Sequence, residues 1–483
     1  MTNRSLSSRI AGFGALRLFV QAVSWISTLL VLRRLGPADY GEAGFALIVS
    51  GWSAAIATQG MPQLVVADSL DDGLAAAAHQ LVVRRSILVF VCVLLSSPVI
   101  AWLLGVQGSA AVLMIASLGI PIEAFRAVPY AVLQRDLKLR EVGIIDATRA
   151  IAASGASVAI AYSWDGPSAL IIGPLIGALL ASAMSVRLTG RLQRAGSSLS
   201  TEQRKTGKRL FIESSIWMLN SNADQMIATR VLGTSAAGLL ALAKTLAALP
   251  SEKLAAMIIP IGTSILASKR DDHTELRRVL VTLAEGIAIV VAIPLAVICV
   301  SGDTVIIPAL GEKWRPAIGL VWILAPFYFA NSVTAVLPQA LSVTGNTLNS
   351  LRIRIALIAF TIPSQIVLSH FFGISGMAWG SLASMPIIFL PALRILHVSI
   401  GLRSLDFVIP ILRAILVSTM VALGFHYSML HLPHALSLAQ RTVASAGVGA
   451  LLTVLAFWQL RSPVIAQLMR AIVPSSLRPR GET

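Results

Sequence analysis

Long apolar stretches, separated by short charged connections, follow one another along almost all of the 483 residues. Their pattern has the period of a helix and lacks the strict alternation of an outer-membrane strand. Each stretch is long enough for a helix that crosses a bilayer, which needs about 20 apolar residues. The pattern therefore predicts an all-α polytopic membrane protein with about 14 transmembrane helices. The predicted spans are residues 10–32, 42–66, 83–104, 110–133, 143–163, 167–188, 210–232, 236–266, 279–300, 317–343, 352–371, 374–397, 405–427 and 437–460.

Composition agrees with a membrane protein and excludes several other classes. Charged residues make up 12% of the chain and the mean hydropathy is +0.81, whereas a soluble domain carries about 25% charged residues. A soluble enzyme, a disordered chain and a secreted disulfide scaffold are excluded. Cys92 and Cys299 both lie inside apolar runs, so we predict no disulfide, metal site or cofactor.

The basic residues set the predicted orientation. If the N-terminus is cytoplasmic, most of the 38 Lys and Arg residues fall on cytoplasmic connections and tails. By the positive-inside rule, both termini are then cytoplasmic. The net charge of +16 is thereby explained without a nucleic-acid partner. The basic residues on the outer side are Arg33, Arg34, Arg230, Lys313, Arg315 and Arg441.

Two short segments repeat 197 positions apart. Residues 33–41 (RRLGPADYG) follow the first span, and residues 230–238 (RVLGTSAAG) follow the seventh. Gly36 and Gly233 are placed where a helix end favours a left-handed residue. A second set repeats 209 positions apart, and it pairs Pro129 with Pro338, Ala131 with Ala340, and Ala169 with Ala378.

The repeat predicts two pseudo-symmetric lobes of six helices with a cleft between them. The first lobe is expected at residues 1–190 and the second at 210–400, joined by a basic linker at 191–209. Two further helices and a tail occupy 401–483. Because each lobe holds an even number of helices, both keep the same orientation in the membrane.

Three segments resemble a known family. Residues 33–41 resemble the R-x-L-G-P-x-D-[YF]-G stretch of bacterial polysaccharide-transport proteins, and residues 133–138 (LQRDLK) are similar to their L-Q-R-D-x-K/R run. Residues 166–170 (GPSAL) look like their G-x-x-A-L entry to the sixth span. On these motifs the chain resembles the Wzx-like flippases of the multidrug/oligosaccharidyl-lipid/polysaccharide exporter superfamily.

The resemblance implies a central cavity between the two lobes. It also implies that the protein flips an undecaprenyl-pyrophosphate-linked oligosaccharide across the bacterial inner membrane by alternating access. The product would serve exopolysaccharide, capsule or O-antigen assembly, with polysaccharide polymerase machinery as a partner. The family has no invariant catalytic motif, so the resemblance assigns no active-site residue.

Cations inside the predicted spans are candidate ligands of the pyrophosphate, because an intramembrane charge is costly. A guanidinium group binds phosphate oxygens with two donors, and lysine acts as a point charge. Arg17 has no acid within four positions, whereas Glu123 and Asp146 lie three positions before Arg126 and Arg149. For those two arginines a local ion pair is the alternative. The candidates are Arg17, Arg126, Arg149, Lys244 and Lys253; Lys253 and Arg413 have the alternative of anchoring at an interface.

A polar stripe marks the seventh span. Glu213, Trp217, Asn220 and Asp224 follow helical spacing and share one face. A carboxylate there would bind H⁺ or Na⁺ and couple transport to an ion gradient; Glu285 in the ninth span is a second candidate. Glu213 has the alternative of lying in solvent near Arg209.

Two other functions compete with flipping. An ion-coupled multidrug or organic-cation antiporter of the same superfamily would need cavity acids without many nearby cations. A membrane polymerase or ligase would need a sizeable outer loop with catalytic residues, and the longest outer connection, residues 301–316, is short. The short outer loop leads us to predict a transporter and not an enzyme. No phosphate-binding loop for ATP is present, so the energy is expected from an ion gradient, the membrane potential or removal of the product. Trp102, Trp164, Trp314 and Trp458 lie near span ends and are expected to anchor in the interface.

Overall fold

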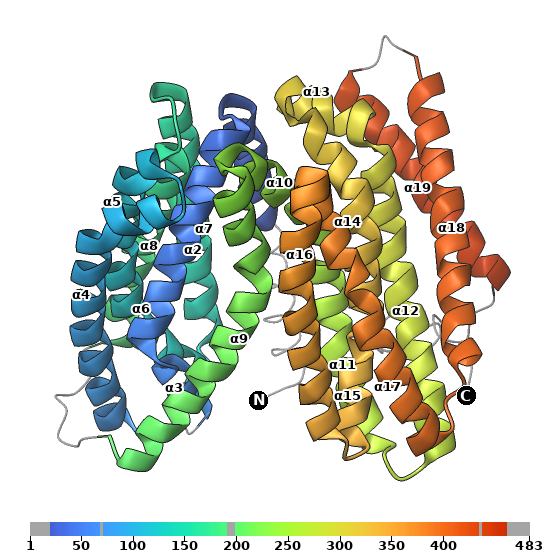
Figure 1. Cartoon of the computed structure of the whole chain (residues 1–483), viewed down its shortest axis with the longest axis horizontal. Helices are drawn as coiled ribbons and strands as arrows, with labels where there is room; N and C mark the ends of the chain where they lie inside the picture. The colour runs from blue at the N-terminus through green and yellow to red at the C-terminus, as the bar shows by residue number, and fades with distance from the viewer. Residues whose placement is uncertain (1–19, 68–70, 191–198, 434–436, 461–483) are drawn as a thin grey trace. The chain divides into compact units, whose positions relative to one another are not determined.

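The computed structural model describes residues 20–67, 71–190, 199–433 and 437–460, and all its regular elements in those ranges are helical (Figure 1). The backbone contacts divide the chain into two compact units, Met1–Ala241 and Leu242–Thr483.

The first unit contains a helix at residues 20–34 and then α2 (Pro37–Thr58), α3 (Met61–Ala67), α4 (Asp72–Leu103), η1 (Gln107–Ser109), α5 (Ala110–Ser117), α6 (Gly119–Arg135), α7 (Leu139–Ser163), α8 (Ser168–Thr189), α9 (Thr201–Leu232) and the start of α10 (Thr234–Pro250). The second unit contains the rest of α10 and then η2 (Ser251–Ala255), α11 (Ala256–Ser268), α12 (His273–Val300), η3 (Gly302–Ile306), α13 (Ile307–Leu310), η4 (Glu312–Trp314), α14 (Arg315–Thr334), α15 (Val336–Val343), α16 (Thr347–Ala383), α17 (Met385–Ile400), α18 (Ser404–His431) and α19 (Leu438–Leu460).

The prediction of an all-α membrane protein is confirmed. In the described part of the chain, eight helical segments are long and apolar enough to cross a membrane. The predicted spans fall on helices wherever the structure describes them, apart from short breaks. One break is Gly373, whose φ of 58° separates two helices within α16 between the predicted spans 352–371 and 374–397. The total of fourteen spans stays a prediction, as do the predicted lobe boundaries.

Small and aliphatic side chains form the cores. In the first unit α7 packs along α8, and α6 packs against α4 and α8; in the second, α12 packs against α14 and α18. The repeated alanines lie in the cores of their units: Ala131, Ala169, Ala340 and Ala378 are all buried. Small residues allow close helix approach, which drives helix association in a bilayer.

Trp314 corrects one expectation. Trp102 and Trp164 are exposed, as interfacial anchors should be, but Trp314 is completely buried. It ends η4, in a connection that folds into the short helices η3, α13 and η4. This compact connection encloses the ring and so turns a predicted anchor into a core residue. Trp458 is among the residues whose side chains are not described.

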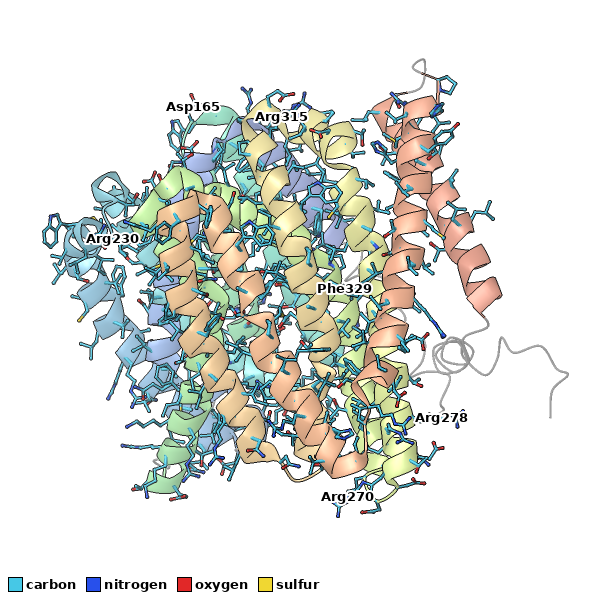
Figure 2. The ribbon with its side chains drawn as sticks, turned by 45° about the vertical axis from the view of Figure 1, so that its right-hand side comes forward. Asp165, Arg230, Arg270, Arg278, Arg315 and Phe329 are labelled. Atoms are coloured by element: carbon cyan, nitrogen blue, oxygen red, sulfur yellow. The ribbon has the colours of Figure 1, made fainter. Side chains whose placement is uncertain are left out.

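Figure 2 shows Arg315 at one end of the second unit and Arg270 and Arg278 at the opposite end. Arg315 forms ion pairs with Asp303 (2.6 Å) and Glu312 (2.7 Å). The basic residues predicted for the two membrane sides therefore lie at opposite ends of the unit. Which end faces the cytoplasm stays a prediction.

The repeated glycines Gly41 and Gly238 meet where α2 and α10 begin. A Cβ atom on Gly41 would lie 1.8 Å from the carbonyl oxygen of Thr234, and one on Gly238 would lie 1.8 Å from that of Pro37. All four positions belong to the first unit. The contact is reciprocal: Pro37 corresponds to Thr234, and Gly41 to Gly238, at the repeat spacing of 197. The repeated motif therefore brings two helix starts together at their backbones.

The turn chemistry of the motif is confirmed for only one copy. Gly233 has a φ of 87°, a conformation that favours glycine. Gly36 instead has an extended backbone with a φ of −84°, so the expected left-handed conformation is wrong there. Its N–H donates to the Asp39 carboxylate at 2.9 Å, which makes Gly36 the start of α2 and not a left-handed helix end.

The LQRD segment closes α6 and joins it to α4. Leu137 takes a left-handed φ of 53°, and the N–H of Lys138 donates to the carbonyl of Leu133 at 3.0 Å, as in a Schellman end. The Arg135 guanidinium then binds Asp72 and Asp136, each at 2.8 Å. Arg135 thus fixes the ends of two helices.

We expect Arg135→Gln to lower the free energy of unfolding by about 1 kcal/mol, because the ion pairs are partly exposed. Thermal unfolding in detergent measures the effect. Arg140→Gln, at an exposed position on the first turn of α7, is the matched control with the same change in charge. Equal midpoints for the two variants would contradict the role of Arg135.

Candidate functional site

Helix α6 carries a polar face opposite its apolar one. Ala124, Val128 and Ala131 are buried, whereas Glu123, Arg126 and Tyr130 are half-buried and share another face. Their spacing of three and four residues puts them in one row along the helix. The row lies beside α7, the next helix in the chain.

Glu123 joins α6 to α7 through two arginines. Its Oε2 atom accepts from Nε of Arg126 at 2.9 Å, and its Oε1 atom accepts from a terminal guanidinium nitrogen of Arg149. One carboxylate thus bridges two guanidinium groups from adjacent helices. Ion-paired hydrogen bonds of this kind are short and strong.

A second acid extends the cluster. The hydroxyl of Tyr130 donates to the Asp146 carboxylate, at 2.8 Å to Oδ1 and 3.0 Å to Oδ2. The Arg126 guanidinium lies over the Tyr130 ring, 4.8 Å from its centroid. Tyr130 therefore contacts both a cation and an anion, and it orients both. We name Glu123, Arg126, Tyr130, Asp146 and Arg149 the arginine cluster.

The cluster lies well inside the helices. Arg126 is nine positions before the end of α6 at Arg135, and Arg149 is ten positions after the start of α7 at Leu139. At 1.5 Å per residue these are depths of about 14 and 15 Å, so both cations lie at one level. Charges at this depth in a transmembrane segment mark candidate functional sites.

The structure confirms one predicted ion pair and adds another. The Arg126–Glu123 pair was expected from spacing on one helix and is present. Arg149, for which spacing suggested Asp146, binds Glu123 across the helix pair, while Asp146 accepts from Tyr130. The turn at Leu137 explains the pairing, because it folds α7 back beside α6 and brings Arg149 near Glu123. That approach was predictable from the sequence, but only once the turn was located.

The other cation candidates are more dispersed. Arg17 lies outside the described residues. Lys244 is half-buried on α10, and Lys253 is exposed on the π-helical turn η2; both belong to the second unit. Arg126 and Arg149 are brought together in the first unit, where they share Glu123.

The candidate coupling acids lie on α9 and α12. Asp224 is half-buried and accepts from the N–H of Gln225 at 2.8 Å; the Gln225 side chain fills the space left by Gly44 on α2. The side chains of Glu213, Trp217 and Asn220 lie outside the described ones. Their role in coupling stays a prediction.

Glu285 has a neighbour that spacing along one helix did not reveal. It is half-buried on α12, close enough to Arg413 on α18 for electrostatic attraction. The two helices pack together, which explains the approach. Arg413, interpreted from the sequence as an interfacial anchor, thus also serves as a counter-charge.

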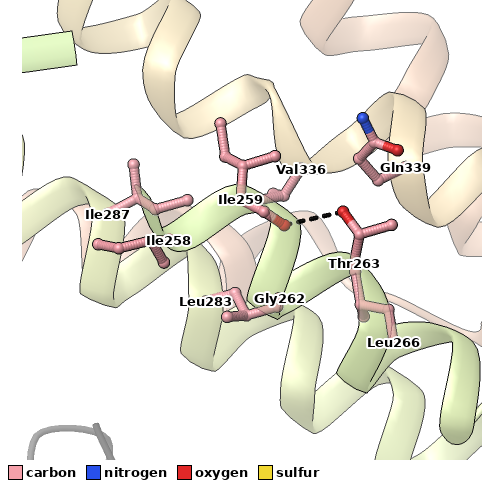
Figure 3. Close-up of a pocket in the computed structure, with 9 residues that line it drawn as sticks. All are labelled: Ile258, Ile259, Gly262, Thr263, Leu266, Leu283, Ile287, Val336 and Gln339. Atoms are coloured by element: carbon pink, nitrogen blue, oxygen red, sulfur yellow. Dashed lines mark hydrogen bonds between the residues drawn. The ribbon is translucent and has the colours of Figure 1, made fainter. Parts of the chain in front are cut away.

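An apolar pocket in the second unit differs from the arginine cluster. It lies between α11, α12 and α15 (Figure 3), and its lining is aliphatic apart from Thr263 and Gln339. The Thr263 hydroxyl donates to the Ile259 carbonyl at 2.8 Å. With no charged group in its lining, this small pocket offers no ligand for a phosphate.

Comparisons with known proteins agree with the predicted superfamily. Residues 30–319 match the model of a family described as polysaccharide biosynthesis protein. The lipopolysaccharide biosynthesis protein WzxC of Escherichia coli (strain K12) is 23% identical over 268 residues, 54% of each chain. The match thus spans about half the length of that relative.

Two solved structures share the fold over most of the chain. The lipid II flippase MurJ, in an inward closed conformation, matches with a TM-score of 0.71 and 13% identity over 93% of this chain and 99% of that one. An inward-facing multidrug transporter of the MATE family in the MOP superfamily matches with a TM-score of 0.63 and 14% identity over 80% and 98% of the two chains. The predicted fold and the resemblance to Wzx-like proteins are confirmed.

Proposed function

The chain belongs to the polysaccharide biosynthesis protein family, and on that premise we propose that it flips a lipid-linked oligosaccharide across the bacterial inner membrane. The relative WzxC is named for lipopolysaccharide biosynthesis, and the fold is shared with a lipid II flippase. Both support a transport role in polysaccharide assembly and not an enzymatic one.

We further propose undecaprenyl pyrophosphate as the lipid carrier. The observation that carries this step is the bridging of Arg126 and Arg149 at one depth of the α6–α7 hairpin. Two guanidinium groups that already hold one carboxylate present the donors that a diphosphate needs. Arg17, Lys244 and Lys253 are proposed as further cations along the path.

Transport would proceed by alternating access, with the head group and sugars passing through the protein and the prenyl tail remaining in lipid. Asp224 and Glu285 are proposed as coupling sites for H⁺ or Na⁺, together with Glu213 and Asn220. An ion gradient or removal of the product would then supply the driving force.

Reconstituted vesicles test this function. We expect the protein to speed the reorientation of a fluorescent undecaprenyl-pyrophosphate oligosaccharide well above the rate in protein-free vesicles, without moving a labelled undecaprenol. The alternative, an organic-cation antiporter, shares the fold. Gradient-driven uptake of an organic cation with no lipid movement would establish that alternative and reject the flippase.

A further inference from the structure

Glu123 contacts Arg126 and Arg149 in the way that a bound anion would. Its two carboxylate oxygens accept from two different arginines on two different helices. A phosphate oxygen pair makes the same contacts with a pair of guanidinium groups. The carboxylate thus reproduces, within the protein, the head-group contacts that the proposed substrate would make.

The cluster is open enough for exchange. The exposed fractions of the side chains are 25% for Glu123, 17% for Arg126 and 38% for Arg149. A fully enclosed pair could not trade its partner without unfolding the helices around it. Here the Glu123 carboxylate is partly exposed, and its ordinary rotamers allow it to leave the arginines.

The second acid is held differently. Asp146 accepts a hydrogen bond from Tyr130, and the Tyr130 ring contacts Arg126. These contacts keep Tyr130 and Asp146 beside Arg126 when Glu123 leaves. Arg126 therefore keeps polar neighbours, and these matter because an isolated guanidinium group inside a membrane is costly.

We propose that Glu123 is an exchangeable internal anion: it neutralises Arg126 and Arg149 in the empty transporter and is displaced by the diphosphate of the substrate. The inference rests on the proposed function, and it explains why a carboxylate, Glu123, lies between the two arginines. A transporter must return empty after each cycle, and two unpaired arginines would make that return expensive. Glu123 removes the cost, and it competes with the substrate for the same donors.

Competition between Glu123 and the diphosphate predicts the direction in which the affinity for the substrate changes. Glu123→Gln keeps the side-chain shape but removes the competing charge, so the variant should bind undecaprenyl pyrophosphate more tightly. If the bridge blocks the site for about nine-tenths of the time, the gain is about tenfold. Inorganic pyrophosphate should bind more weakly than the lipid to both proteins, but its affinity should rise by the same factor in the variant. Undecaprenol should bind equally to both proteins.

The experiment is a titration of full-length protein in detergent, followed by native mass spectrometry, with undecaprenyl pyrophosphate, inorganic pyrophosphate and undecaprenol as probes. Glu141→Gln is the matched control, because it removes a half-buried acid from the first turn of α7, outside the arginine cluster. Its affinity should equal that of the wild type. Glu123→Asp, which keeps the charge on a side chain too short to bridge both arginines, should gain affinity by a smaller factor.

The outcomes are distinct. Unchanged or weaker binding of undecaprenyl pyrophosphate by Glu123→Gln, while the wild type binds it, overturns the exchange and leaves the flippase standing. If Glu123→Gln does not fold, Glu123→Asp decides in the same way. Failure of the wild type to distinguish undecaprenyl pyrophosphate from undecaprenol overturns the proposed lipid carrier itself. A gain for inorganic pyrophosphate alone overturns the lipid head group as the displacing anion.

Discussion

Gly41→Ala is expected to destabilise the first unit by about 3 kcal/mol, the upper range for overpacking. The new methyl group would lie 1.8 Å from the Thr234 carbonyl oxygen and 2.8 Å from the backbone nitrogen of Gly238. Backbone atoms cannot rotate away as a side chain can, so α2 and α10 must separate. The midpoint of thermal unfolding in detergent, with the yield of monodisperse protein, measures the loss.

The partner glycine sharpens the experiment. Gly238→Ala should cost a similar amount, because its Cβ would meet the Pro37 carbonyl oxygen at 1.8 Å. Once one methyl has separated the helices, the second adds little, so the double variant should be much less destabilised than the sum of the two. Gly155→Ala, with nothing within 4 Å of its Cβ, is the control and should be neutral or slightly stabilising. Additive losses, or a Gly41→Ala protein as stable as this control, would disprove the backbone contact.

The glycine contact shows what the repeat could predict and what it could not. Two copies of a motif at a fixed spacing predicted related halves, and a turn was predicted only for Gly36 and Gly233. The structure shows that the copies contact each other, so a side chain added at Gly41 would also meet Gly238. A periodicity within one chain does not reveal contact between its copies, because contact depends on how the helices are oriented.

The candidate site was predictable to the extent that its contacts were local. Arg126 and Glu123 pair within one helix, and their spacing was sufficient. Arg149 reaches Glu123 from the next helix, which required the position of the turn at Leu137. Glu285 and Arg413 are far apart in sequence and belong to α12 and α18, so only the packing of the helices relates them.

Removal of the whole charge cluster separates its structural role from its transport role. Arg126→Gln with Arg149→Gln leaves Glu123 without its two cations. Breaking a buried ion pair costs about 3–5 kcal/mol, and the cost for this half-buried carboxylate is expected near the lower end of that range. Loss of activity in that double variant would therefore not distinguish misfolding from loss of binding. Adding Glu123→Gln neutralises the site completely, and the triple variant should unfold near the wild-type temperature.

Transport by the triple variant should nevertheless fall by at least about 100-fold, because two charged hydrogen-bonding groups would be missing, each contributing about 1.5–3 kcal/mol. The measurement is reorientation of the fluorescent undecaprenyl-pyrophosphate oligosaccharide in vesicles. Arg140→Gln is the control for loss of a cation, since Arg140 is exposed on the first turn of α7 and lies outside the arginine cluster, and it should transport at close to the wild-type rate. A stable triple variant that transports at the wild-type rate would reduce Arg126 and Arg149 to a structural ion pair and move the head-group site to other cations. The triple variant removes opposite charges together, so the packing of α6 against α7 should stay in place. If it is stable and still binds undecaprenol but no longer moves the undecaprenyl-pyrophosphate oligosaccharide, the head group is recognised in the α6–α7 hairpin.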